Sequence, residues 1–219
     1  MKLAIFNGSP RGKKSNSKLL MDHFLIGYSR ICQEPVPIHY IVNSKLQEEG
    51  KENFRDAETI IIIFPLYTDC MPGIVKEFFE KIAEVEFNNT KKIGYIVQSG
   101  FPEAIHSVYI ERYLEKLTNR LKCNYLGTII KGGVEGIQSM PPRMTKKLFR
   151  KFEEVGAYFA NNNTFSPEIK ESLRRPFKMS SMSRFIFSAI SKTGLINYYW
   201  NKELKENDAY QKRFDRPFV

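Results

Sequence analysis

"KLAIFNGSPRGKKSNSKLLMDHFLIGYSR", residues 2–30, contains the pattern that decides the fold. An apolar run over residues 2–6 meets a loop of glycine, serine, proline, asparagine and cations, and helical spacing begins at residue 17. The apolar run is continuous rather than alternating, which is typical of a strand buried on both faces. A buried strand that passes through a short loop into a helix predicts an α/β fold with a parallel sheet.

The same kind of apolar run recurs along the chain. The later runs are VPIHYIV (36–42), TIIIIF (59–64), KIGYIVQ (92–98) and YLGTIIKG (125–132). Segments with helical spacing occupy residues 17–30, 72–84, 103–121 and 145–160. Residues 43–58 are short and polar, and they leave the second crossover without a defined helix. This alternation predicts a five-stranded parallel sheet with right-handed crossovers.

Apolar stripes in the predicted helices indicate which face packs on the sheet. In residues 72–84 the stripe consists of Val75, Phe78, Phe79 and Ile82. In residues 103–121 it consists of Ile105, Val108, Tyr109, Tyr113, Leu117 and Leu121. We expect both stripes to be buried against the strands.

Composition and charge narrow the class of protein. The 219 residues carry a formal net charge of +10, which favours anionic partners such as nucleotides, nucleic acid or an acidic membrane. Cys32, Cys70 and Cys123 are too widely spaced for a disulfide framework or a cysteine-rich metal site, so we expect no metal. The first apolar run is too short for a signal peptide, and no stretch approaches the roughly 18 residues that span a bilayer. We therefore expect a cytoplasmic protein.

Three loops of unusual composition follow strands that are neighbours in a sheet of order 2-1-3-4-5. They are NGSPRGKKSNS (7–17), PLYTDCMPG (65–73) and SGFPE (99–103). Because ligands bind outside the carboxyl ends of parallel strands where the strand order reverses, we expect these loops to converge on one cleft.

The first loop has the composition of a terminal phosphate site. Gly8 allows a tight turn, and the helix that begins near Ser17 points unpaired amides and a partial positive charge at the loop. Ser9 and Asn16 can donate hydrogen bonds, and Arg11 can donate a charge-assisted pair. The spacing fits neither a Walker-type loop nor a GxGxxG fingerprint. An ordinary strand-to-helix turn with a serine N-cap is the alternative interpretation.

The second and third loops suit a flat ring. Two prolines stiffen the second loop, Tyr67 offers an aromatic face, and Gly73 permits close approach at the start of the next helix. Alternatively, Tyr67 only covers the end of the sheet. The third loop mixes glycine, an aromatic residue and proline, or it is only a helix start with Glu103 in the first turn.

The motifs GSPRGKKSNS, PLYTDCMPGIVKEFFEKI and SGFPE occur in this order after the expected strands. On these motifs the chain resembles the flavodoxin-like NAD(P)H-dependent FMN reductases, together with related quinone reductases and iron–sulfur flavoproteins. The resemblance covers about residues 1–160 and implies a flavodoxin-like, doubly wound sheet of order 2-1-3-4-5 that binds FMN. Residues 161–219 have no counterpart in it, and we expect them to form a C-terminal helical extension.

The resemblance also implies which residues bind the cofactor. The implied residues are Ser9, Arg11, Ser15, Asn16 and Ser17 at the phosphate, Pro65, Leu66, Tyr67 and Thr68 along the isoalloxazine, and Ser99, Gly100, Phe101 and Glu103 beside another part of the ring. We assign no catalytic side chain, because the redox chemistry belongs to the flavin. His106 is either a proton donor or an ordinary surface residue. We expect Cys70 to be a small buried hydrophobic residue.

The expected function is therefore an FMN-dependent oxidoreductase. It would take hydride from NAD(P)H and pass electrons to a quinone, free flavin or other small acceptor. One alternative is an FMN-binding electron carrier or regulator without NAD(P)H activity, and another is a flavin-free basic interaction module. Because the basic residues lack the aromatic interleaving of a nucleic-acid-binding module, we expect no nucleic-acid partner. The stretch between Cys32 and Cys70 contains no cysteine, so we expect no iron–sulfur centre.

Two further segments have alternative interpretations. Residues 182–200 form a basic amphipathic pattern that either contacts an anionic membrane or packs on the body or across a dimer interface. Its apolar positions are Phe185, Ile186, Ala189, Ile190 and Leu195, set among Arg184 and Lys192. The run GGVEG, residues 132–136, is either a lid beside the ring or a turn. Since members of the family are commonly dimers or tetramers, we expect a homo-oligomer.

Overall fold

The computed structural model describes residues 2–86, 90–193 and 197–216. The chain divides into two compact units, Met1–Lys178 and Met179–Val219. The division into a flavin-binding domain over 1–160 and an extension over 161–219 stays a prediction.

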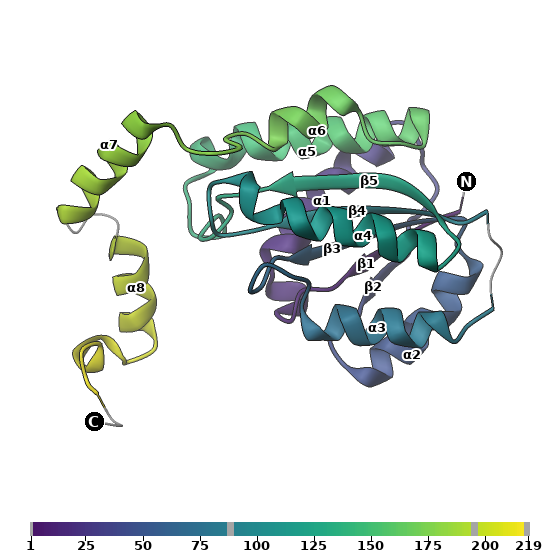
Figure 1. Cartoon of the computed structure of the whole chain (residues 1–219), viewed down its shortest axis with the longest axis horizontal. Helices are drawn as coiled ribbons and strands as arrows, with labels where there is room; N and C mark the ends of the chain where they lie inside the picture. The colour runs from purple at the N-terminus through teal and green to yellow at the C-terminus, as the bar shows by residue number, and fades with distance from the viewer. Residues whose placement is uncertain (1, 87–89, 194–196, 217–219) are drawn as a thin grey trace. The chain divides into compact units, whose positions relative to one another are not determined.

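A five-stranded sheet forms the centre of the first unit (Figure 1). Its strands are β1 (Leu3–Asn7), β2 (Ile38–Tyr40), β3 (Thr59–Pro65), β4 (Lys92–Gln98) and β5 (Asn124–Lys131). All pairs are parallel and the order is β2-β1-β3-β4-β5. The predicted fold class and strand order are confirmed.

Helices cover both faces of this sheet. They are α1 (Asn16–Ser29), α2 (Ser44–Asp56), α3 (Gly73–Ala83), α4 (Val108–Arg120), α5 (Pro142–Asn162) and α6 (Pro167–Leu173). Alternate residues of β3 point to opposite faces, so Ile60 and Ile62 join the core under α2, α3 and α4, while Ile61 and Ile63 join the core under α1 and α5. Every residue of β1 and β3 is buried, as their continuous apolar sequence predicts.

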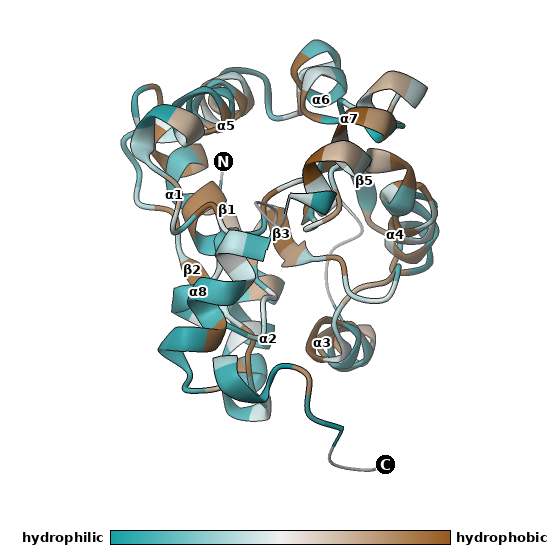
Figure 2. Ribbon diagram, turned by 90° about the vertical axis from the view of Figure 1, so that its left-hand side faces the viewer, coloured by the Kyte–Doolittle hydropathy of each residue, from teal (hydrophilic) through white to brown (hydrophobic). Residues whose placement is uncertain are grey.

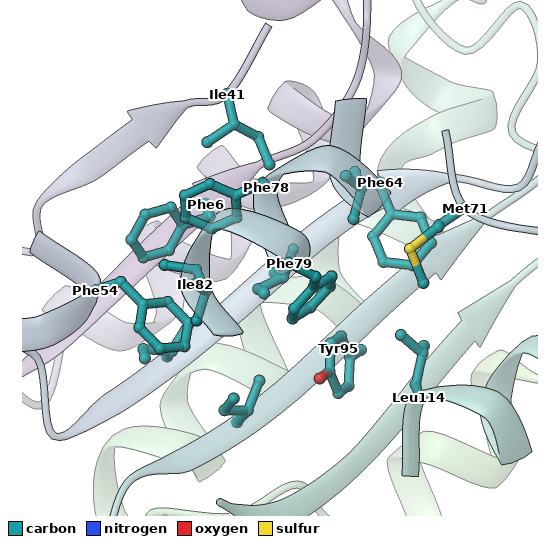
Figure 3. Close-up of a cluster of buried hydrophobic side chains, with 14 of the residues drawn as sticks. Phe6, Ile41, Phe54, Phe64, Met71, Phe78, Phe79, Ile82, Tyr95 and Leu114 are labelled. Carbon is teal, nitrogen blue, oxygen red and sulfur yellow. The ribbon is translucent and has the colours of Figure 1, made fainter. Parts of the chain in front are cut away.

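The core beneath α2 and α3 is rich in aromatic rings (Figure 3). Phe54 of α2 lies 5.9 Å from Phe6 and 6.1 Å from Phe78, measured between ring centroids. The polar segment 43–58 therefore does form a helix, with Asn43 as its N-cap and Phe54 as its anchor in the core. The predicted stripe of α3, which includes Phe78, is entirely buried.

The strand β2 is shorter than the predicted run 36–42. Pro37 has no amide proton for the ladder, and only its carbonyl takes part, accepting from Ile5 N at 2.9 Å. The strand therefore begins after the proline, at the edge of the sheet.

The predicted face of α4 is confirmed at Leu117 and Leu121, which pack against the core, and is wrong at Tyr109 and Tyr113. Tyr109 and Tyr113 are 72% and 47% exposed, and the buried stripe consists of Ile110, Leu114 and Thr118. The chain enters α4 through a 3₁₀ turn, η2 (Ala104–Ser107), which has three residues per turn and so shifts the phase of the following helix. The buried Thr118 hydroxyl lies 2.7 Å from the Tyr95 hydroxyl, so both polar atoms have partners in the core.

The segment after α5 packs closely on the first unit. Phe165 is buried over Gly94 of β4, where a Cβ atom would come within 2.8 Å of the Phe165 ring. On α6, Lys170 Nζ lies 2.9 Å from a carboxylate oxygen of Glu111 on α4, and Arg174 bonds the other oxygen. Farther on, the Pro176 carbonyl accepts from the Ala104 amide at 3.0 Å. Core packing and ion pairs thus fix α6 in place beside β5.

The second unit contains the helices α7 (Ser181–Lys192) and α8 (Tyr198–Glu206). Figure 2 shows that α8 is mostly hydrophilic. Residues 194–196 of the predicted amphipathic segment 182–200, including Leu195, lie outside the described residues. Within the described ranges, no helix combines the length and the apolar character that crossing a membrane requires.

Candidate functional site

The three loops singled out in the sequence meet at the carboxyl edge of the sheet, around a cavity of about 80 Å³. The cavity is lined by Ser9, Arg11 and Asn16 of the first loop and α1, by Pro65, Leu66 and Tyr67 after β3, by Gln98, Ser99 and Gly100 at the end of β4, and by Glu135 after β5. The predicted residues Ser15, Ser17, Thr68, Phe101 and Glu103 do not line it.

The first loop turns at Gly12 rather than at Gly8. Gly12 has a φ of +52°, in the left-handed region that favours glycine. Gly8 instead permits close packing, because a Cβ atom there would lie 2.3 Å from Val75 Cγ2 on α3. The Ser9 amide donates to Asn7 Oδ1 at 2.9 Å, which fixes the chain as it leaves β1.

The hydroxyl groups at the start of α1 are already engaged within the protein. Ser15 is the N-cap, since its Oγ accepts from Lys18 N at 3.1 Å and donates to the Gly12 carbonyl at 2.6 Å. The Ser17 side chain is buried, and its Oγ accepts from Gln98 Nε2 at 3.5 Å. Ser15 and Ser17 therefore stabilise the loop, and the ordinary capping interpretation holds for Ser15.

The amide groups that open α1 are better placed to bind an anion. The backbone amides of Asn16 and Ser17 precede the first intrahelical hydrogen bond and carry the positive end of the helix dipole. The Asn16 side chain donates to the Val134 carbonyl at 2.9 Å and so ties α1 to the loop after β5. In the first loop and α1, the lining residues Ser9, Arg11 and Asn16 supply a hydroxyl, a guanidinium and the start of a helix as donors for a ligand.

Glu135 occupies one side of this cavity and pairs with Arg11, with 3.7 Å between Arg11 Nη1 and Glu135 Oε1. The loop 132–136 is held in place because Val134 N donates to the Ser99 carbonyl at 3.0 Å. A Cβ atom at Gly132 would lie 2.4 Å from the Phe101 carbonyl oxygen, so only glycine fits there. The segment is thus a tightly packed turn that brings a carboxylate to the cation of the first loop.

The loop after β3 ends in a strained turn. Tyr67 N donates to the Cys70 carbonyl at 2.9 Å, and Cys70 N donates back at 3.0 Å. Between them Thr68 and Asp69 have φ values of +49° and +60°, which cost roughly 1–2 kcal/mol each for residues other than glycine. The turn holds Tyr67 with 45% of its surface exposed, and Cys70 is exposed rather than buried as expected.

Backbone amides at the ring loops fall into two groups. The amides of Leu66, Tyr67 and Ser99 donate to carbonyl groups of the protein, at 2.7, 2.9 and 3.0 Å. Across the described ranges, the exposed residues Thr68, Asp69, Gly100 and Phe101 have backbone amides without a hydrogen-bond partner. Of these residues only Gly100 lines the cavity, so its amide can donate to a ligand there.

The volume of the cavity limits what it can hold. Pockets for cofactors and drug-sized ligands usually enclose about 300–1,000 Å³, so a cavity of about 80 Å³ suits a group of phosphate size. A guanidinium, a hydroxyl and a helix N-terminus are a donor set typical of phosphate sites. A planar ring is too large for the cavity, and the lining residue Tyr67, with 45% of its surface exposed, is available to stack on it. The residues present therefore fit the two chemical parts of FMN.

His106 and Glu103 lie at the start of η2, beside the third loop. Their closest approach is 3.6 Å, between His106 Nε2 and Glu103 Oε2, and the His106 ring centroid is 4.9 Å from that of Phe101. His106 thus contacts a predicted ring residue without reaching the cavity.

Two lining residues were missed by sequence reasoning. Gln98 is the last residue of β4, and a polar residue that closes an apolar strand was the available signal. Glu135 stands in GGVEG, which was considered only as a lid or a turn. Its pairing with Arg11 depends on a contact across 124 positions, which no local pattern encodes.

Solved structures of low sequence identity share this fold. An FMN-dependent NADH-azoreductase from Bacillus anthracis, in complex with FMN, superposes with a TM-score of 0.55 at 16% identity, over 73% of this chain and 99% of that chain. An NADPH-quinone reductase from P. pentosaceus superposes with a TM-score of 0.52 at 16% identity, over 70% of this chain and 96% of that chain. An NAD(P)H:quinone oxidoreductase from Methanothermobacter marburgensis superposes with a TM-score of 0.55 at 13% identity, over 72% of this chain and 96% of that chain.

The comparison with curated proteins gave no significant match. A family model described as flavodoxin-like fold matches residues 1–154, which include all five strands and the three loops of the candidate site. The sheet order and the match agree with the resemblance seen in the sequence motifs. The chain belongs to the family of proteins with this flavodoxin-like fold.

Proposed function

We propose that the protein is an FMN-dependent oxidoreductase that takes hydride from NAD(P)H and passes electrons to a quinone, free flavin or another small acceptor. The observation that carries the proposal is the meeting of three loops from separate segments around phosphate-type donors, with the exposed ring of Tyr67 in the lining. Solved structures with the same fold include proteins described as an FMN-dependent NADH-azoreductase and an NADPH-quinone reductase, which supports this choice.

In this proposal the phosphate is held inside the cavity. Ser9 and Arg11 donate from their side chains, and Asn16 donates from its backbone amide at the helix N-terminus. Arg11 must exchange its Glu135 partner for the phosphate. The pair is partly exposed, and such pairs contribute about 1 kcal/mol or less, so a dianion can displace the carboxylate.

The loops after β3 and β4 would hold the ring on their outer surface. FMN, when bound, supplies the hydride and electron transfer chemistry. The unpaired amides of Thr68, Gly100 and Phe101 would supply hydrogen-bond donors for the negative charge of a reduced ring. The strained turn at Thr68 and Asp69 presents Tyr67 for stacking. No side chain has to act as a nucleophile in this arrangement.

Visible spectroscopy of the protein tests the proposal directly. The full chain is incubated with FMN, desalted, and titrated anaerobically with NADH and with NADPH. We expect a yellow protein whose absorbance bleaches with at least one nucleotide. A yellow protein that neither nucleotide bleaches would favour an electron carrier, and a colourless protein would overturn the FMN site itself.

The expected partners are a pyridine nucleotide and a small electron acceptor. Assembly into a homo-oligomer and peripheral membrane contact through segment 182–200 stay predictions. In the described part of that segment, Phe185, Ile186 and Ile190 of α7 are exposed apolar side chains, and Arg184 and Lys192 supply positive charge. This pattern is consistent with either a membrane surface or a protein partner.

A further inference from the structure

A second, larger recess lies between the end of β5, α5 and α6, and its volume is about 800 Å³. It shares no lining residue with the cavity of the candidate site. Figure 1 shows α6 running alongside α5, and residues of both helices line the recess. Its volume lies within the roughly 300–1,000 Å³ typical of small-molecule sites.

Cations from three parts of the chain line the recess. They are Lys131 at the end of β5, Lys147 and Lys151 on α5, and Arg175 after α6. Lys151 Nζ donates to Ser172 Oγ at 2.9 Å, and Arg175 Nε lies 4.0 Å from Glu171 Oε1. Within the part of the chain that the structure describes, Lys131 and Lys147 form no ion pair. The recess therefore contains positive charge that the protein does not neutralise.

Lys131 is partly buried, so keeping its side chain charged costs free energy. Burial lowers the pKa of Lys131 from its ordinary value, and the nearby charge of Lys151 lowers it further. A partly buried ammonium without a counterion loses hydration that nothing replaces. An anion bound beside the Lys131 ammonium would compensate for its lost hydration, so the recess favours an anionic ligand.

Most of the other lining residues are apolar or acidic, which limits the class of ligand that fits. Met144, Leu148 and Leu173 supply an apolar wall. Glu168 and Glu171 also border the recess, and they would repel a polyanion such as nucleic acid. The ligand that matches this lining is a small molecule with one anionic group and an apolar body.

We infer that the recess lined by α5 and α6 binds a small amphiphilic anion, with its anionic group at Lys131 and Lys147 and its apolar body against Met144, Leu148 and Leu173. The inference does not depend on flavin binding, because the two sets of lining residues are separate. The wall formed by α6 is firmly attached through Phe165 and through the ion pairs to Glu111, so the recess is a fixed feature of the first unit.

Calorimetric titration of the full chain with octanoate tests the inference. Inorganic phosphate, which has only the anionic group, and octanol, which has only the apolar body, are the comparison probes. We expect octanoate to bind at least about tenfold more tightly than either probe, since it alone uses both parts of the lining. Absence of octanoate binding, or equal binding of phosphate, overturns the inference.

Two variants locate the site. Lys131→Met keeps the length of the side chain and removes its charge, and it should weaken octanoate binding about tenfold. Lys146→Met is the matched control, because Lys146 is the neighbour of Lys147 but lines a different groove, between α1 and α5. Its affinity for octanoate should match that of the unmodified protein. Equal effects of the two substitutions contradict the assignment, and unchanged thermal unfolding shows that each variant is folded.

Discussion

Two recesses near the carboxyl ends of the strands differ in whether a carboxylate of the protein pairs with their cation. In the cavity of about 80 Å³, Arg11 faces Glu135, so a carboxylate of the protein stands where a ligand phosphate would bind. In the recess of about 800 Å³, Lys131 has no such partner within the described residues. Lys131 and Glu135 are separated by only a tight glycine turn, yet each lines a different recess. Under the two proposals, an anion that binds in the first cavity has to displace a carboxylate of the protein, whereas an anion that binds in the second recess does not.

The largest expected effect comes from breaking the turn that links the two recesses. Gly132→Ala places a Cβ atom 2.4 Å from the Phe101 carbonyl oxygen, and a backbone atom cannot move aside cheaply. We expect the free energy of unfolding to fall by about 2–3 kcal/mol, as measured by urea denaturation. Gly73→Ala is the control, because a Cβ atom there meets nothing within 4 Å. Similar losses in both variants would show that the turn is not closely packed.

A smaller effect is expected from removing the cation of the first cavity. Arg11→Ala should weaken FMN binding about tenfold, because the phosphate loses a charge-assisted donor that is partly exposed to solvent. Quenching of FMN fluorescence measures the affinity. Lys14→Ala removes a cation of the same loop that does not line the cavity, and its FMN affinity should stay close to that of the unmodified protein. An unchanged affinity in Arg11→Ala would contradict the phosphate assignment.

The smallest effect is expected from removing the internal anion. Glu135→Gln keeps the shape of the side chain but removes the charge that competes for Arg11, so FMN should bind about two- to fivefold more tightly. The double variant with Arg11→Ala should lose this gain, because the competition requires the guanidinium. Weaker FMN binding in Glu135→Gln would show instead that the carboxylate supports the site, and the contrast between the recesses would then disappear.

The sequence by itself determined the framework of this protein. Five apolar runs and the helical stripe of α3 predicted the parallel sheet, and the family resemblance of the loop motifs implied its strand order and the edge where a site forms. These features are readable because burial on two faces requires a continuous apolar run, and burial on one face requires a helical period. The meeting of the loops follows from strand order alone.

Only the tertiary structure decided how the site is made. It showed that the Ser15 and Ser17 hydroxyls already have partners, that the exposed face of α4 carries Tyr109 and Tyr113, and that α6 completes a recess. Each of these depends on atoms brought together from distant segments, and the sequence pattern reports only the tendency of a residue to be buried. Whether a polar group already has a partner depends on its neighbours in space. The sequence pattern therefore could not show that Arg11 pairs with Glu135, or that Lys131 has no ion-pair partner among the described residues.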